Sequence, residues 1–582
     1  MKLNKKIWLA ALLAVALCFT LVACSDSDDT GAVTQSENAS GLEAITITMA
    51  TKINPLNSEY GILSCPVALY IRDRFGITID AIIAEDGSDW GTRMNALIAA
   101  NDLPDVFLID DIVQIPMLIQ ANQILRLDDF INPEIMPFTY SDNTARAANI
   151  LHRQHSEDGS LYTLGFTRGT WDVGSGTLVG DYIRWDLYAA MGYPEINSYQ
   201  DLLYVLRDMQ EMFPTNVHGQ TAFAIGGWFG DGQGWGDFLF YHGLTWSVGQ
   251  MMDTMDRTVS LDISTNTLSQ TNLLKDSDGV FWNIMWFYNQ AHQMGILDPE
   301  SFTQTYDMYM EKVEAGRYYY VAPRWVAEIA QDAFNEEGMY EIGFAMFPDV
   351  SGGGVQTLLD NMPSGERALG VASKAEHPER ILNFLDWMSS FEGSTVVING
   401  VEGAFWDMVD GIPTPRAELF DGSHTTDDLM LYGGVGTFGH MRGFANGTVD
   451  PRFSQPVDLT LRGDVLEATL SVVQRDQLEH FGASSLFELY TRNLTVFENN
   501  NVIELGPLPA DLRLSATNLE DFMFRTIFGI IMANSDAEFE QMRDQFMIDI
   551  DQFDADAIHE FYLQQAAELA SVVAEVNALL GG

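Results

Sequence analysis

The chain has few basic residues. Seven lysines occur in 582 residues, and 30 lysines and arginines together face 82 acidic residues, for a formal charge of −52. Nucleic-acid binding needs a basic surface to meet phosphates, so this balance excludes a nucleic-acid partner. It also argues against a polyanionic ligand on a broad basic surface, although a few arginines could hold a single acidic sugar. Low lysine with high acid is typical of salt-adapted proteins, but solubility alone explains it equally well.

Long hydrophobic runs are missing beyond the first 30 residues, where no later stretch reaches 18 apolar residues. Three lysines precede an apolar run from Ile7 to Val22 that only Thr20 breaks. A basic segment followed by such a run is typical of a secretory signal, and the run is short for a membrane span.

The junction Leu21-Val22-Ala23-Cys24 resembles the bacterial lipoprotein signal, in which the chain is cut before the cysteine and the sulfur is acylated. The resemblance implies a signal peptide over 1–23, a lipid such as palmitate on Cys24, and a flexible tether over 24–43. An ordinary signal or a single-pass anchor is the alternative. We therefore expect a lipid-anchored protein on the extracellular face of the cell membrane, with two acyl chains as a stable anchor.

Cysteine is also scarce. Cys18 lies in the predicted signal and Cys24 is the predicted lipid site, which leaves Cys65 as a lone, buried thiol. A chain with a core of this size does not need a disulfide.

Catalytic and metal motifs are absent as well. His-Glu-x-x-His and Gly-x-Ser-x-Gly do not occur, and His152 and His155 have no evident third ligand, so neither an enzyme nor a zinc site is predicted. Asp276-Ser277-Asp278-Gly279 is similar to part of a calcium loop but lacks the distant glutamate. Calcium is kept only as an open alternative, and no cofactor is expected.

The order of predicted elements indicates an α/β fold. The alternation of Ile45, Ile47 and Met49 predicts a strand over 44–50, and the next segments predict a β-α-β-α-β order. These segments are a helix over 63–75, a strand over 77–83, a helix over 90–101 and a strand over 105–109. Further helices are predicted over 199–212, 280–294, 325–335, 378–390, 536–550 and 556–580, and further strands over 342–347 and 369–372.

Five segments in order resemble the extracellular solute-binding lipoproteins of bacterial ABC importers (LipO-like, family 1 solute-binding proteins). They are Met94 to Asp105, Asp158 to Tyr162, Ile183 to Leu202, His377 to Trp387 and Gly400 to Trp406, with Gly295 to Pro299 in support.

The resemblance implies a two-lobe periplasmic-binding-protein-like fold of type II, with a ligand cleft between the lobes and extra C-terminal helices. Lobe one would comprise 44–165 and 367–418, and lobe two 166–366 and 419–582. It further implies a monomer that captures a solute, most simply an oligosaccharide, and delivers it to permease subunits by hinge closure. A peptide-binding lipoprotein and an extracellular glycoside-degrading enzyme are the alternatives.

Candidate ligand contacts come first from tryptophans that no helical pattern buries. Trp228 and Trp235 lie in a glycine-rich stretch, Trp171 lies near the predicted crossing between lobes, and Trp325 follows a strand-like run. Aromatic faces of this kind stack on sugars. Trp282 and Trp286, in contrast, have helical spacing and are predicted to be core residues.

Polar candidates follow predicted strands, because ligands of α/β sheets gather at strand carboxyl ends. Asn57, Glu59 and Tyr60 follow the first strand, and Asp110 and Asp111 follow the strand over 105–109. Glu402 and Trp406 belong to the last of the five segments; Glu402 would contact ligand or stabilise the turn.

Overall fold

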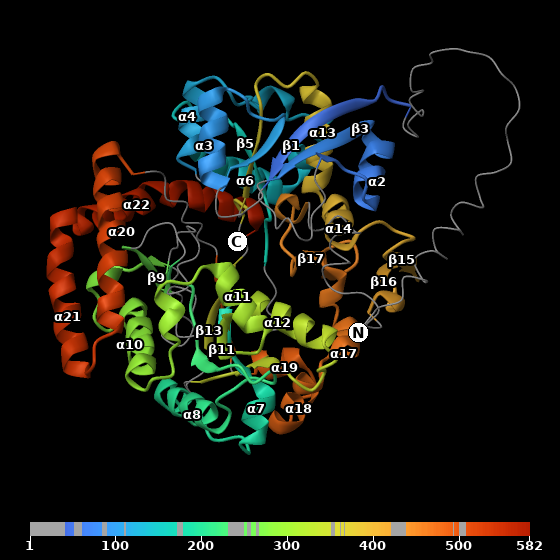
Figure 1. The fold of residues 1–582 in the computed structure, drawn as a ribbon. Coiled ribbons are helices and arrows are strands. Elements are labelled where there is room, and N and C mark those ends of the chain that lie inside the picture. Colours follow the sequence, from blue (N-terminus) through green and yellow to red (C-terminus); the bar gives the residue numbers. More distant parts are fainter. Residues whose placement is uncertain are drawn as a thin grey trace, which may run out of the picture.

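A computed structural model shows two lobes, with the blue and gold elements of lobe one above the green elements of lobe two (Figure 1). It describes residues 41–581 with internal gaps. The residues outside the description are 1–40, 52–60, 84–89, 110–111, 171–178, 231–249, 253–257, 263–266, 351–354, 361–362, 366, 421–437, 493, 500–507 and 582.

Lobe one is built on a six-stranded sheet in the order β2-β3-β1-β4-β14-β5. The strands are β1 (Ile45–Thr51), β2 (Gly61–Ile62), β3 (Ile77–Ile83), β4 (Val106–Ile109), β5 (Thr163–Phe166) and β14 (Arg367–Val371). Strand β1 pairs in parallel with both β3 and β4, whereas β14 is antiparallel to β4 and β5. The predicted β-α-β-α-β start of an α/β lobe is confirmed.

Burial explains why these residues form strands. Ile45, Ile47 and Met49 of β1 are buried in alternation, and all four residues of β4 are buried, as expected for a strand covered on both faces. The covering helices are α2 (Pro66–Phe75), α3 (Trp90–Ala100), α4 (Gln114–Gln120), α5 (Pro137–Ser141), α6 (Asn143–His152), α13 (Pro378–Ser389) and α14 (Phe391–Asn399). Helix α2 has proline in its first turn and ends at Gly76 in the left-handed conformation.

Lobe two has a four-stranded sheet in the order β12-β6-β11-β7. Its strands are β6 (Val179–Arg184), β7 (Phe223–Ile225), β11 (Tyr318–Pro323) and β12 (Phe344–Met346). Ser198 caps α8 by accepting from the Asp201 N–H, and Trp282 and Trp286 pack in the core, as predicted. The helices are α7 (Trp185–Ala190), α8 (Tyr199–Met212), α10 (Val280–Gln293), α11 (Tyr306–Glu314), α12 (Arg324–Glu336), α18 (Val472–Phe481) and α19 (Leu486–Thr491).

The chain passes between the lobes before Val179, after β12, and again between Val457 in lobe one and Val473 in lobe two. The first two crossings fix which sheet edges face each other. In lobe one, β5 runs parallel to β4, since both are antiparallel to β14, so the chain leaves at the carboxyl edge of β1 and β4. In lobe two, the crossing enters at Val179, which lies opposite Pro323 at the carboxyl end of β11. The second crossing leaves after β12 and returns at Arg367, opposite Phe166. The carboxyl edges of both sheets therefore face the other lobe.

The remaining elements extend lobe two and join it to lobe one. Strand β13 (Val355–Asp360) pairs in parallel with β19 (Leu494–Asn499), and α17 (Gly463–Thr469) precedes α18. The C-terminal helices are α20 (Ala510–Ile531), α21 (Asp536–Asp549) and α22 (Ala555–Leu580), close to the predicted bounds.

The structure corrects the assignment of residues 419–582 to lobe two. Phe438 and Met441 belong to the core of lobe one, and Phe444 packs with Ile398 of α14. The end of α22, at Val576, packs against α6. An apolar segment indicates that it is buried but carries no signal about which lobe it packs against, so the sequence could not predict this exchange.

Candidate functional site

In the sheet of lobe one, the strand order reverses between β1 and β4. Strand β1 sits between β3 and β4, with Met49 opposite Val106 and Ala50 opposite Phe107. Such switch points are where open α/β sheets bind ligands. The five predicted polar contacts follow these two neighbouring strands, and they lie outside the described residues: Asn57, Glu59, Tyr60, Asp110 and Asp111.

A carboxylate holds the two strands together at the amino end of β4, away from the carboxyl edge. Asp105 Oδ2 accepts hydrogen bonds from the Thr48 amide at 2.8 Å and the Thr48 hydroxyl at 2.9 Å. The Asp105 amide donates back to Thr48 Oγ1 at 2.9 Å. Asp105 therefore fixes β4 beside β1, and its role is structural.

The facing edge of lobe two carries an aromatic cluster. Trp325 comes directly after β11, is half-buried, and hydrogen bonds to half-buried Tyr306. The Tyr306 ring meets Trp228 edge to face at 5.3 Å between centroids. Burial raises the pKa of Tyr306 to about 12. Trp325 and Tyr306 thus pack against the core of lobe two and keep part of their surface exposed.

Trp228 is the fully buried member of this cluster. Its side chain is 0 % exposed and also packs on Tyr309 at 4.8 Å, which stacks on Tyr318 at 5.3 Å. The arrangement gives Trp228 a packing role in this conformation. Tyr306 is the partly exposed member of this ring pair. The sequence did not predict it, because a tyrosine in the first turn of a helix has no distinguishing pattern.

A buried ionic network lies beside the described part of the glycine-rich stretch, Gly226 to Gly230. Lys312 Nζ lies 2.7 Å from Asp298 Oδ2, and the Tyr318 hydroxyl donates to the same oxygen at 2.6 Å. Burial, with the Asp298 charge, raises the pKa of Tyr318. A Cβ on Gly226 would lie 2.2 Å from the Tyr318 ring, so only glycine fits there.

The two crossings touch each other tightly. A Cβ on Gly165 would lie 1.8 Å from the Ser364 carbonyl oxygen, and Gly365 has a φ of +87° with Phe166 O only 2.5 Å from its ideal Cβ. His152 joins β5, which leads into the first crossing, to the end of the second crossing, with Nδ1 2.8 Å from Thr163 Oγ1 and Nε2 2.9 Å from Ser364 O.

Arg168 anchors the first crossing to lobe one. Its guanidinium donates to Ser389 Oγ at 2.8 Å and to the carbonyls of Ser389 and Gly165 at 2.6 Å each. The ring of Phe444 lies 4.8 Å from its Cζ. Burial lowers the pKa of Arg168 to about 10, which leaves it charged at neutral pH.

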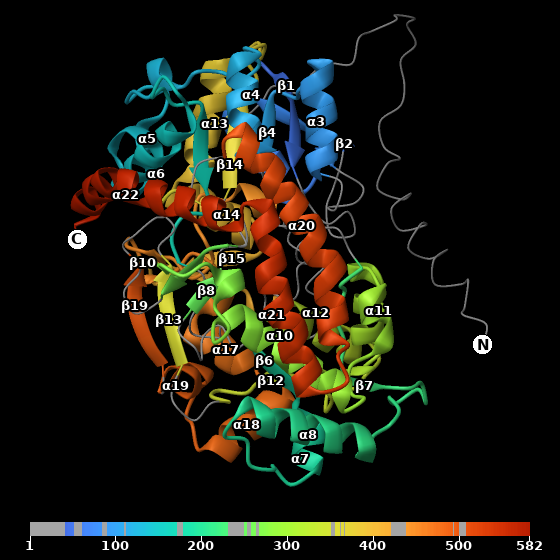
Figure 2. The same ribbon diagram turned by 90° about the vertical axis from the view of Figure 1, so that its left-hand side faces the viewer.

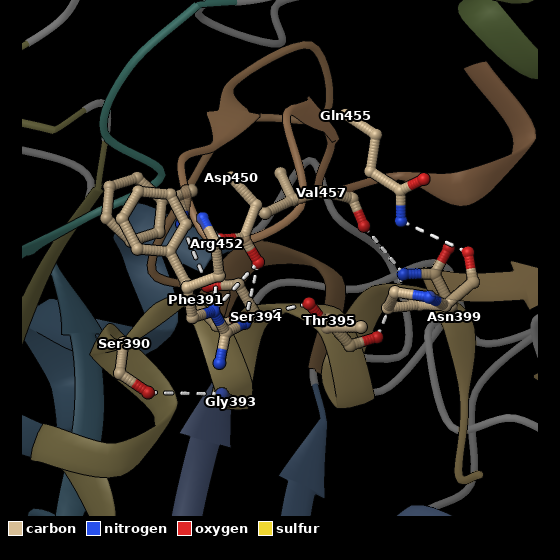
Figure 3. Close-up of polar contacts among 12 residues, drawn as sticks. Ser390, Phe391, Gly393, Ser394, Thr395, Asn399, Asp450, Arg452, Gln455 and Val457 are labelled. Carbon is tan, nitrogen blue, oxygen red and sulfur yellow. Dashed lines mark hydrogen bonds and ion pairs between the residues drawn. The ribbon is translucent and has the colours of Figure 1, made fainter. Parts of the chain in front are cut away.

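A third segment, 444–459, is attached to α14 beside the crossing (Figure 3). Phe444 stacks on Phe391 at 4.0 Å, and its amide donates to Ser394 Oγ at 3.2 Å. Asn399 donates to the Val457 carbonyl at 2.7 Å and accepts from the Leu459 amide at 2.7 Å. This segment therefore moves with lobe one.

The motif from Gly400 to Trp406 forms a turn. Trp406 is 7 % exposed and donates its indole N–H to Gly400 O at 2.8 Å, while Glu402 is exposed. Gly400 has a φ of +78°, and a Cβ there would meet Phe405 at 2.4 Å. The geometry gives Trp406 a role in the turn, and ligand contact by Glu402 stays a prediction.

Residues 70–394, more than half of the chain, match the family of bacterial extracellular solute-binding proteins. The chain belongs to this family. The match runs from α2 to α14 and includes the crossings before Val179 and after β12, while β1 lies before its first residue. No curated protein matches the chain.

Solved structures show the same fold for the solute-binding protein. The Streptococcus pneumoniae ABC-transporter substrate-binding protein FusA, in complex with kestose, is 13% identical with a TM-score of 0.58 over 90% of this chain and 100% of that one. The alginate-binding protein AlgQ2 is 13% identical, with a TM-score of 0.57 over 92% of this chain and 100% of that one. A human-milk-oligosaccharide (HMO) binding protein from Bifidobacterium longum infantis is 14% identical, with a TM-score of 0.56 over 90% of this chain and 98% of that one. The predicted periplasmic-binding-protein-like fold is confirmed.

Several predicted positions of the solute-binding protein cannot be placed. Cys24, Trp171 and Trp235 lie outside the described residues. In the described part of the chain, no helix is long and apolar enough to cross a membrane. Among those same residues, no three His, Cys, Asp or Glu side chains group to hold a metal ion, and calcium at Asp276 to Gly279 stays a prediction.

Proposed function

We propose that the chain is the lipid-anchored binding component of an ABC importer and that it captures a neutral oligosaccharide between its two lobes. The observation that carries the proposal is the geometry of the two carboxyl edges, which face each other across the crossings. The solved relatives that share the fold are described as binding kestose, alginate or human-milk oligosaccharides.

Charge and aromatic placement favour a neutral sugar. Removal of residues 1–23, which hold three lysines and no acids, brings the formal charge to −55. A polyanion such as alginate would meet a repulsive field. The half-buried Trp325 and Tyr306 offer ring faces to sugar C–H surfaces and a hydroxyl to sugar hydroxyls.

Hinge closure follows from two rigid lobes joined at the crossings. A ligand that contacts both edges stabilises the closed arrangement by the free energy of those contacts. Membrane permease subunits would then recognise the closed form, and no chemical step is needed.

A thermal-shift screen of the chain from residue 25 onward tests the proposed ligand class. Kestose, nystose and human-milk oligosaccharides should raise the melting temperature, because a ligand at 100 times its Kd stabilises by about 2.7 kcal/mol. Peptides and alginate fragments serve as comparison sets. Stabilisation by peptides alone would contradict the sugar ligand, and turnover of a glycoside would contradict a pure binding role.

A matched pair of variants ties such binding to the lobe-two edge. Trp325→Ala should weaken the Kd by tenfold or more, because one aromatic face lost from a binding centre costs about 2 kcal/mol. Trp286→Ala removes another partly buried tryptophan that packs against the core of lobe two, on α10, and should leave the Kd unchanged. Equal affinities for both variants would remove Trp325 from the site.

The lipid on Cys24 has its own test in a bacterial expression host. Labelled palmitate should enter the wild-type chain and the Cys65→Ser control but not Cys24→Ser, and intact mass should place the mature N-terminus at Cys24. A mature chain without acyl mass would contradict the anchor.

A further inference from the structure

The last helix, α22, is rooted in lobe two. Its first residues Ala555, Ile558 and Tyr562 are buried in the core of lobe two, and Asn272 Nδ2 donates to the Ala555 carbonyl at 2.9 Å. The helix has 26 residues, which gives a length of about 39 Å. That length is enough to reach well beyond the lobe in which it begins.

The other end of α22 packs on lobe one. Val576 is buried against Ala147 and Leu151 of α6, with a fringe of half-buried side chains, namely Ile150, Val572 and Leu579. Between Tyr562 and Val576 no residue of the helix is buried. Figure 2 shows α22 running from the pair α20 and α21 to a position beneath α5 and α6. The helix is therefore fully buried only near its two ends, and between them one face is half-buried, with Leu563 and Ala566 packed against lobe two and Val572 against lobe one.

Helix α6 leads directly to both crossings. It ends at His152, whose ring nitrogens lie at 2.8 Å from Thr163 Oγ1 and 2.9 Å from Ser364 O. The contact of α22 thus reaches the two segments about which the lobes turn. No other part of the described C-terminal region after α20 joins the two lobes in an apolar cluster.

We propose that α22 is a strap that sets the equilibrium between lobe arrangements, and that its contact with α6 must slide or release when a ligand draws the lobes together. A helix fixed in one rigid body shifts against a second body that rotates, by a distance that grows with its separation from the hinge. A contact present in one arrangement and absent in the other biases the equilibrium by its own free energy. The inference rests on the proposed ligand-driven closure.

A reversible cross-link tests the strap. The double variant Ala147→Cys with Val576→Cys joins α6 to α22 in a chain that starts at residue 25, where Cys65 is buried. With kestose as the probe, the oxidised form should bind at least tenfold more weakly than the same sample after reduction. Equal Kd values in the two states overturn the strap.

A second measurement needs no ligand and separates the strap from the proposed function. Val576→Asp should speed hydrogen exchange in α6, in the second half of α22 and in the crossing over 163–170. Ala578→Asp adds the same charge at an exposed position two residues further along α22. It should leave hydrogen exchange in all these segments unchanged. If kestose fails to bind, the exchange data alone test the strap. Faster exchange in α22 of Val576→Asp with unchanged exchange over 163–170 would overturn the proposal.

Discussion

At the scale of single residues, Asp181 is the group whose chemistry the fold alters most clearly. It lies on β6, is 6 % exposed, and accepts hydrogen bonds from the hydroxyls of Tyr199 and Tyr320 at 2.8 Å each. Burial raises its pKa to about 6, although the two tyrosine hydroxyls favour the charged form. Desolvation therefore outweighs two hydrogen bonds at this site.

The raised pKa predicts how stability depends on pH. Between pH 4 and 6 the folded chain holds a proton on Asp181 that the unfolded chain has lost. The free energy of unfolding should therefore fall by about 3 kcal/mol across that range and level off above it. Asp181→Asn, which cannot titrate, should remove this fall in urea unfolding at pH 4.5 and 7.

An exposed carboxylate provides the control for that experiment. Glu336→Gln changes an exposed position at the end of α12 and should keep the wild-type dependence. If Asp181→Asn retained the full fall in stability between pH 4.5 and 7, the proton would reside elsewhere.

At the scale of elements, the sequence predicted regular segments well because their period matches their burial. The alternation in β1, the apolar run of β4 and the Ser198 cap of α8 are local features, and each was confirmed. The partners of elements depend on contacts far apart in the chain. The attachment of 444–459 to α14 and the reach of α22 to α6 had no local signal and could not be predicted.

In the candidate site, too, local features could be predicted from the sequence and distant packing contacts could not. The end of a strand could be predicted from the sequence, and Trp325 does follow β11, while its contact with a ligand stays a prediction. Trp228 lies in a glycine-rich stretch that gave no sign of burial, yet its side chain is fully buried, and the neighbouring Gly226 lies close against the Tyr318 ring. Which of two aromatic residues faces outward is decided by packing that no spacing encodes.

At the scale of the whole molecule, charge is the dominant feature. With 82 acidic and 30 basic residues, most exposed carboxylates have no cation to pair with. Their mutual repulsion favours expanded states and opposes folding, and it acts over a Debye length that falls from about 10 Å at 0.1 M salt to about 3 Å at 1 M. Exposed ion pairs such as Arg72 with Asp73 contribute little against this.

Screening of this repulsion should stabilise the fold. We expect the melting temperature at pH 7 to rise by several degrees between 0.05 and 1 M NaCl, and to rise equally in KCl, because screening depends on ionic strength. At pH 4, where many carboxylates are protonated, the rise should shrink. A rise of the same size at both pH values would instead point to stronger burial of apolar surface by salt, and a flat or falling melting temperature at pH 7 would show that the acidic surface does not strain the two lobes.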